Sequence, residues 1–209
     1  MIIAGGDVTP PALIESEIMA PRLISPAAAT PVSLAEAKAH LRIDSADQDA
    51  LIQTFIDSAT AHLDGWTGIL GRCMVAQTWA VFGADFADCS LPFPDIDASA
   101  VVVKYYDAAN VQQTLDAANY RVYVDTDTPY LVYDSSSVAP EVYSRDDAIT
   151  IEFVAGYGAT SDVPAPLRTA ILILVARAYD DSAGQNSAAL AGGYDPVKML
   201  TAPYRRRAI

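Results

Sequence analysis

The chain has 209 residues, enough for one large domain or a smaller one with an insertion, and 52% of them are hydrophobic. Its 13 basic and 26 acidic residues give a net charge of −13, which excludes general binding to a nucleic-acid backbone. No apolar run reaches the ~20 residues that a bilayer-spanning helix needs, so we expect a soluble protein without a membrane partner.

The first thirty residues are rich in proline and alanine and show no sustained period. We interpret residues 1–30 as an extended N-terminal arm that becomes ordered only against another surface. Acidic residues stand where a secretory signal would be basic, so no signal peptide is expected. Two cysteines, Cys73 and Cys89, are too few for a disulfide scaffold, which favours synthesis in a reducing cytoplasm.

Two consecutive helices are expected at residues 33–43 and 46–65, where apolar residues recur at helical spacing. Ser33, with a glutamate three residues later, predicts a capping box at the start of the first helix. Ser45, with a glutamine three residues later, predicts a second one. Gly65 is expected to end the pair.

From about residue 75 to residue 156 the hydrophobic period changes to two, which predicts an antiparallel β-rich insertion arranged as a meander. The expected strands are QTWAVF, SAVVVKYYD, YRVYVD, PYLVYD and AITIEFVAG. In the last of them Ile149, Ile151 and Phe153 should face a core, because they alternate with polar residues.

A long apolar helix is expected at residues 165–181, after a proline-containing first turn. The inner stripe is expected to hold Leu167, Ile171, Leu174, Val175 and Ala178.

Three further apolar residues of this helix, Leu172, Ile173 and Ala176, fall largely outside the inner stripe. A helix that is apolar on more than one side must be covered on more than one side. We therefore expect Leu172, Ile173 and Ala176 to contact a neighbouring subunit.

Residues 183–209 are expected to form a loop, a short helix opened by Asp195 and Pro196, and a basic C-terminal tail. The tail contains the one basic cluster of an acidic chain. A solvated terminus is one reading of this cluster, and an anchor on an acidic patch of another subunit is the other. The residues of the cluster are Tyr204, Arg205, Arg206 and Arg207.

The sequence contains none of the catalytic or phosphate-binding motifs HExxH, GxSxG or a Walker loop, so no enzyme activity, cofactor or metal is expected. Two alternatives stay open. A thiol hydrolase would place Cys73 or Cys89 beside His62. A glycan- or host-surface-binding module would use the tyrosine-rich strands, which hold Tyr105, Tyr106, Tyr120, Tyr123, Tyr130 and Tyr133.

Two segments carry a resemblance to a known family: PVSLAEAKAHLRIDSADQDALIQTFIDSATAHLDGWTG and VAGYGATSDVPAPLRTAILILVARAYDD. The chain resembles the head–tail connector proteins of tailed bacteriophages and prophages, also called adaptor or head-completion proteins. The likeness covers residues 31–182, which we take as the connector domain. The long arm before Pro31 and the size of the strand insertion depart from the plainest members.

The resemblance implies a non-enzymatic virion protein, made in the host cytoplasm and located at the neck. It implies a homo-oligomeric ring of roughly a dozen copies beneath the portal protein, with a stopper or tail protein below it. DNA would pass through the channel without specific binding. It also implies that the C-terminal tail reaches the portal or a neighbouring subunit.

We therefore predict an α+β connector, built from a helical core with an antiparallel β-rich insertion. The core comprises the N-terminal helix pair and the long C-terminal apolar helix. Its predicted function is a structural joint between capsid portal and tail.

Overall fold

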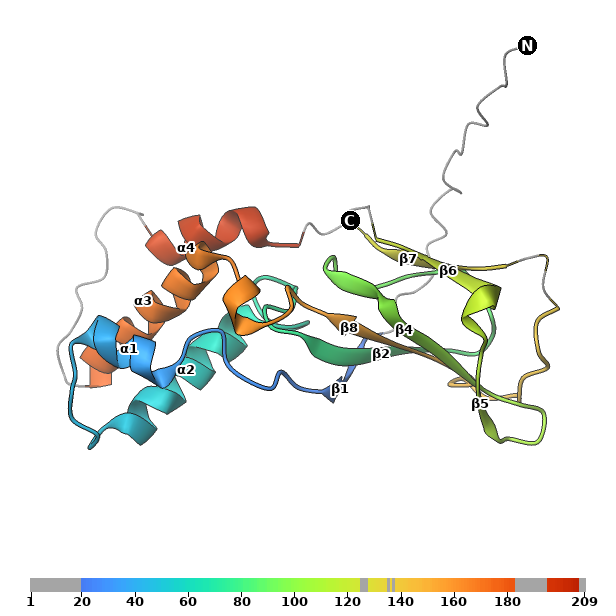
Figure 1. Cartoon of the computed structure of the whole chain (residues 1–209), viewed down its shortest axis with the longest axis horizontal. Helices are drawn as coiled ribbons and strands as arrows, with labels where there is room; N and C mark the ends of the chain where they lie inside the picture. The colour runs from blue at the N-terminus through green and yellow to red at the C-terminus, as the bar shows by residue number, and fades with distance from the viewer. Residues whose placement is uncertain (1–19, 125–127, 135, 137, 183–194, 207–209) are drawn as a thin grey trace, which may run out of the picture.

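Helices gather at one end of an elongated molecule and strands at the other in the computed structural model (Figure 1). The structure describes residues 20–124, 128–134, 136, 138–182 and 195–206. The predicted α+β class is confirmed. We call the helical end the helical lobe and the other end the β lobe.

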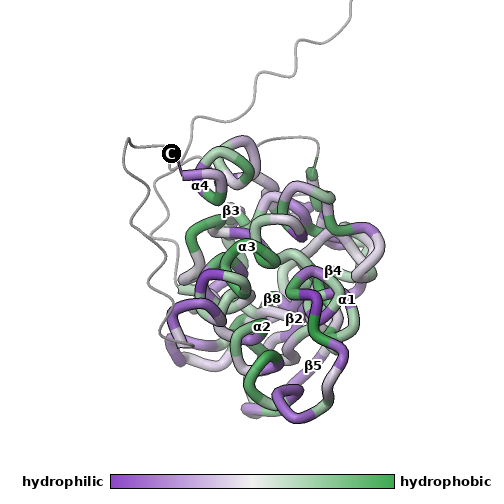
Figure 2. The backbone as a smooth tube through the Cα atoms, turned by 90° about the vertical axis from the view of Figure 1, so that its left-hand side faces the viewer, coloured by the Kyte–Doolittle hydropathy of each residue, from purple (hydrophilic) through white to green (hydrophobic). Residues whose placement is uncertain are grey.

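The helical lobe consists of α1 (Leu34–Leu41), α2 (Asp49–Leu63), α3 (Ala165–Ser182) and α4 (Pro196–Thr201). In both views α3 lies between α2 and α4 (Figures 1 and 2), while α1 packs against α2 and α3. Three helices of the same chain thus cover the long apolar helix. Their side chains form one core with α3, and none of the large apolar side chains of α3 is among the exposed ones.

One of the two predicted capping boxes is present at the helix termini. Ser33 and Glu36 form the predicted capping box at α1, with the side chain of each bonded to the backbone of the other. The capping box predicted at Ser45 is wrong: α2 begins three residues later than expected, and the Ser45 hydroxyl donates to Asp47 instead. A short serine-to-aspartate bond competes with helix capping because it satisfies the same side chain locally.

The β lobe holds eight strands among the described residues. They are β1 (Arg22–Ser25), β2 (Gln77–Gly83), β3 (Cys89–Ser90), β4 (Ile96–Tyr106), β5 (Gln112–Thr114), β6 (Tyr120–Tyr123), β7 (Tyr130–Tyr133) and β8 (Ile149–Ala155). All five strands expected from the alternation are present, as β2, β4, β6, β7 and β8. Ile149, Ile151 and Phe153 of β8 are buried, as their spacing predicts.

The strands pair in two antiparallel sheets, with the orders β1-β2-β8-β4-β5 and β3-β7-β6. The predicted meander is therefore wrong, because β8 inserts between β2 and β4 and pairs with both. Five of the seven residues of β8 are buried, which suits the centre of a sheet. Side-chain alternation reveals that β8 is buried but not which strands lie beside it.

Three short strands were not predicted from the alternation of polar and apolar residues. β1 lies within the segment that we interpreted as an arm, and it pairs antiparallel with β2 at the edge of the larger sheet. All four residues of β1 are exposed, including Leu23 and Ile24. β3 has two residues and β5 has three, so neither is long enough to establish a period.

Each lobe has its own hydrophobic core. Leu63, Met74, Leu167 and other residues fill the helical one, and Phe93, Phe153 and their neighbours fill the β one. The chain crosses between the lobes where β8 leaves the sheet toward α3. At Gly156 the backbone has φ +130°, and a Cβ built there would lie 2.6 Å from the carbonyl oxygen of Val75. Only glycine tolerates both the left-handed conformation and this approach.

Replacing Gly156 with alanine should lower the free energy of unfolding by about 2–4 kcal/mol, because the strand must move away from Val75. Urea denaturation followed by far-UV circular dichroism measures this change. Gly83→Ala is the matched control, since a Cβ at Gly83 meets nothing closer than 3.8 Å. Equal effects at the two glycines would contradict the account of the crossing.

Candidate interaction surfaces

The outer side of α3 is the first surface to which the sequence points. Leu172, Ile173 and Ala176 are half-buried rather than open, while Leu167, Ala170, Ile171 and Val175 are fully buried. Leu174 and Ala178, expected on the inner stripe, are half-buried as well. The chain's own helices cover most of this helix, and the remaining apolar area is modest.

More open apolar side chains lie on the two flanking helices. Leu51 on α2 is 42% exposed and Met199 on α4 is 61% exposed. Leu51 is one of the apolar residues that recur at helical spacing in the predicted second helix, whereas no sequence signal singled out Met199. Neither contributes to the buried core of the helical lobe.

The C-terminal segment packs onto the chain itself. Asp195 caps α4 through the backbone N–H of Val197, and its carboxylate also accepts a hydrogen bond from Arg177 of α3 at 3.2 Å. Val197 and Thr201 are buried against the helical lobe. The predicted short helix opened by Asp195 and Pro196 is confirmed.

Arg206 joins the two lobes. Its backbone N–H donates to the carbonyl oxygen of Leu70 at 2.8 Å, and its guanidinium donates to the carbonyl oxygen of Pro92. The guanidinium also lies 4.5 Å from the ring centre of Trp66, a cation–π geometry. Burial lowers the pKa of Arg206 from its usual range. We call Arg206 with Leu70, Pro92 and Trp66 the Arg206 clasp.

The other residues of the basic cluster differ from Arg206 in their exposure. Arg205 is exposed, and its Nε donates to the carbonyl oxygen of Ile69 at 3.2 Å. Tyr204 is half-buried against the core of the helical lobe. Arg207 lies outside the described residues. Among the described members, Arg205 is therefore the one open to a partner.

Half-buried charged groups lie at the junction of the lobes. The carboxylate of Asp64 accepts hydrogen bonds from the backbone N–H of Met74 and the amide of Gln77. Burial raises the pKa of Asp64, and these hydrogen bonds oppose the rise. Arg72 approaches Asp95 at 3.1 Å, and burial raises the pKa of Asp95 as well.

The Asp95 oxygen nearest Arg72 has no well-aligned hydrogen bond, so this contact is a charge pair. Arg72 also donates to the hydroxyl of Tyr157, in the Gly-Tyr-Gly segment between β8 and α3. These groups have partners in the same chain. Together, Arg72 and its two partners link Asp95 of the β lobe to Tyr157, which packs against the core of the helical lobe.

The tyrosine-rich strands present little open aromatic surface. The hydroxyl of Tyr120 donates to the carbonyl oxygen of Val101, and Tyr133 packs edge-on against Phe86. Tyr123 and Tyr130 are stacked across β6 and β7, with ring centres 4.8 Å apart and planes at 13°. Tyr123, which is 42% exposed, is the open member of this group.

The thiol and histidine groups do not form a nucleophilic pair. Cys73 is 1% exposed in the β-lobe core, whereas His62 is exposed at the end of α2. Burial raises the pKa of Cys73, and it raises the pKa of Cys89 to about 11. A catalytic thiol needs the opposite shift. No group of three or more His, Cys, Asp or Glu side chains suited to a metal occurs in the part of the chain that the structure describes.

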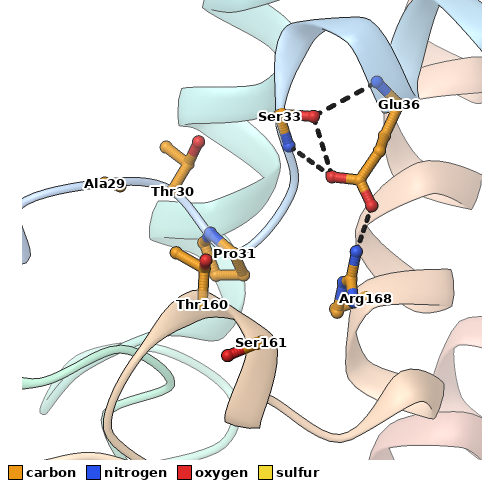
Figure 3. Close-up of a pocket in the computed structure, with 8 residues that line it drawn as sticks. All are labelled: Ala29, Thr30, Pro31, Ser33, Glu36, Thr160, Ser161 and Arg168. Atoms are coloured by element: carbon orange, nitrogen blue, oxygen red, sulfur yellow. Dashed lines mark hydrogen bonds and ion pairs between the residues drawn. The ribbon is translucent and has the colours of Figure 1, made fainter.

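An open cleft of about 360 Å³ lies where residues 29–31 meet α1 and α3 (Figure 3). It is lined by Ala29, Thr30, Pro31, Ser33, Glu36, Thr160, Ser161 and Arg168. Glu36 accepts hydrogen bonds from both Ser33 and Arg168, and the bonds from Ser33 and then the charge of Arg168 lower its pKa. The two charged groups of the cleft satisfy one another, so it serves to join α1 to α3.

No helix within the described ranges combines the length and the hydropathy needed to cross a bilayer. The longest, α3, carries two arginines and two aspartates along its 18 residues.

Comparisons with known proteins point to a structural protein of phage-like particles. Residues 31–124 match the family model of phage gp6-like head–tail connector proteins. The resemblance indicated by the sequence is thus confirmed, and it supports a structural connector role. No curated protein sequence matches the chain at a significant level.

Solved structures share the fold over nearly the whole chain. A chain from the neck of an empty gene transfer agent (GTA) particle, computed with C6 symmetry, gives a TM-score of 0.71 at 22% identity. That match covers 91% of this chain and 97% of the other. A chain from the neck of the native GTA particle, computed with C12 symmetry, gives 0.69 at 21% identity with the same coverages.

Arg206→Ala should lower the free energy of unfolding by about 2 kcal/mol, because it removes the cation–π contact and a hydrogen bond. It should also change the fluorescence of Trp66, measured in a Trp79→Phe background so that Trp66 is the sole tryptophan. Arg205→Ala is the matched control and should stay within ~0.5 kcal/mol of the parent. An Arg206→Ala variant with an unchanged free energy of unfolding would show that the clasp does not stabilise the fold.

The thiols of the folded protein should react slowly with iodoacetamide. For Cys89 at pH 8, the raised pKa lowers the thiolate fraction about a hundredfold relative to an exposed cysteine. Mass spectrometry of protein alkylated with and without urea measures the difference. Rapid alkylation of Cys73 or Cys89 in the folded state would revive the thiol-hydrolase alternative.

Proposed function

We propose that this chain is a head–tail connector of a phage-like virion, a structural protein that forms a closed ring at the neck. The observation that carries the proposal is the shared fold with chains of GTA necks, over 91% of this chain. The match of residues 31–124 to the connector family model supports the same conclusion. The cyclic symmetries with which these necks were computed support a ring for this chain, and we take twelve copies from the C12 case.

The ring joins the portal protein of the capsid to a stopper or tail protein and extends the DNA channel between them. The net charge of −13 suits a channel wall, because acidic groups repel a phosphate backbone and do not hold passing DNA. The protein acts through its contacts, without a catalytic step.

Two groups of residues carry these contacts in the proposal. Leu172, Ile173 and Ala176 of α3 add apolar area to the contact between subunits. The basic cluster at the end of segment 195–209 docks on the portal, and Arg205 is the exposed cation among its described residues. The docking surface comprises Tyr204, Arg205, Arg206 and Arg207. Because the Arg206 clasp already engages Arg206, its part in docking is to hold the segment in place.

The alternative, a glycan- or host-surface-binding module, rests on the tyrosines of β4, β6 and β7. Tyr123 alone is largely open, and Tyr120 and Tyr133 are engaged within the β lobe. A single exposed ring stacked on its neighbour is a small platform for a sugar. The connector function accounts for more of the chain than the glycan-binding function does, because the shared fold extends over both lobes.

Mixing the chain with the purified portal protein of the same virus should produce rings on the portal, visible by negative-stain electron microscopy. Arg205→Glu should weaken portal binding about tenfold, because a charge-assisted contact becomes a repulsion. Arg121→Glu is the control, since Arg121 is exposed on β6 of the other lobe. Absence of rings and of portal binding would overturn the proposal, and equal effects of the two variants would remove only the docking role of Arg205.

A further inference from the structure

A closed ring of identical subunits needs two different patches on each subunit, one meeting the other across every interface. The helical lobe offers two such patches on opposite sides. α3 separates α2 from α4 in both views (Figures 1 and 2), so one subunit cannot cover its own pair. This inference rests on the proposed ring and names the surfaces that would close it.

The first patch lies on α4 and the turn that follows it. Met199, Ala202 and Pro203 are all exposed and follow the spacing of one helical face. Lys198, also exposed, lies beside Met199, and no other described side chain bonds its ammonium group. We call these four residues the α4 patch. It is apolar at its centre and basic at its rim.

The second patch lies on the outer face at the start of α2. Leu51 is 42% exposed and Phe55, one turn later, is half-buried. Asp44 and Asp47 are exposed in the turn that precedes α2, where Arg42 supplies one opposing positive charge. We call Asp44, Asp47, Leu51 and Phe55 the α2 patch. It is apolar with an acidic rim.

We propose that the α4 patch of one copy binds the α2 patch of the next copy, so that Met199 lies against Leu51 and Phe55 while Lys198 faces Asp47. The two patches are complementary in charge as well as in apolar character. Complementary rims suppress the wrong pairings, because α4 against α4 brings together like charges. The contact is head-to-tail, and it propagates until the ring closes.

Engineered disulfides test the register of this contact. A chain with Leu51→Cys and Met199→Cys, in a Cys89→Ser background that keeps the buried Cys73, is assembled on the portal and oxidised with diamide. Non-reducing electrophoresis should show a ladder of covalent oligomers up to the closed ring. A mixture of the two single-cysteine chains should stop at dimers that contain one of each.

Val111→Cys with Met199→Cys is the matched control, because Val111 is 53% exposed but lies in the β lobe. Rings in electron micrographs without a ladder from the Leu51 and Met199 pair would overturn this inference and leave the connector function standing. Dimers that are cross-linked through position 51 of both copies would also overturn the inference, since they require a two-fold contact. Absence of rings would overturn the connector function and this inference together.

Charge exchange gives a second, independent test. Lys198→Asp should reduce the fraction of chain in rings several-fold, and Asp47→Lys should do the same. The double variant, with both changes in one chain, should recover most of the loss because the two rims are exchanged. Met199→Asp should reduce ring formation about tenfold, whereas Val111→Asp should not. Circular dichroism checks that each variant is folded, and failure of the double variant to recover would contradict the pairing of Lys198 with Asp47.

Discussion

The crossing of the chain between its two cores is the constraint on which the rest of the structure depends. β8 is the central strand of the larger sheet and α3 is the central helix of the helical lobe, and the nine residues 156–164 connect them. At Gly156 the backbone passes so close to Val75 that no side chain fits. Tyr157 then bonds Arg72, which in turn approaches Asp95. These contacts fix the position of the crossing between the two cores.

Local patterns predicted the elements well, because each depends on residues close together in the sequence. The capping box at Ser33 and the burial of alternate residues in β8 are cases of this kind. The alternation did not predict the pairing of β8 with β2 and β4, because strand order depends on contacts between distant segments. The alternation did not predict β1, because all four of its residues are exposed and none of them faces the core.

The interaction surfaces were less predictable than the fold. The unbroken apolar run of α3 indicated a need for cover, but sequence cannot distinguish cover by the same chain from cover by a second copy. The structure shows that α1, α2 and α4 supply most of it. The basic cluster at the C-terminus likewise gave no sign that Arg206 would lie on Trp66, since 140 positions separate the two. Only the fold places Leu51 and Met199 on the two helices that flank α3.

The Arg206 clasp has a geometric consequence for the whole molecule. Because Arg206 is held to Leu70 of one lobe and Pro92 of the other, it lies where the two lobes meet rather than at either end of the elongated molecule. A protein that binds Arg205, the exposed neighbour of Arg206, would therefore contact the molecule at the junction of its two lobes.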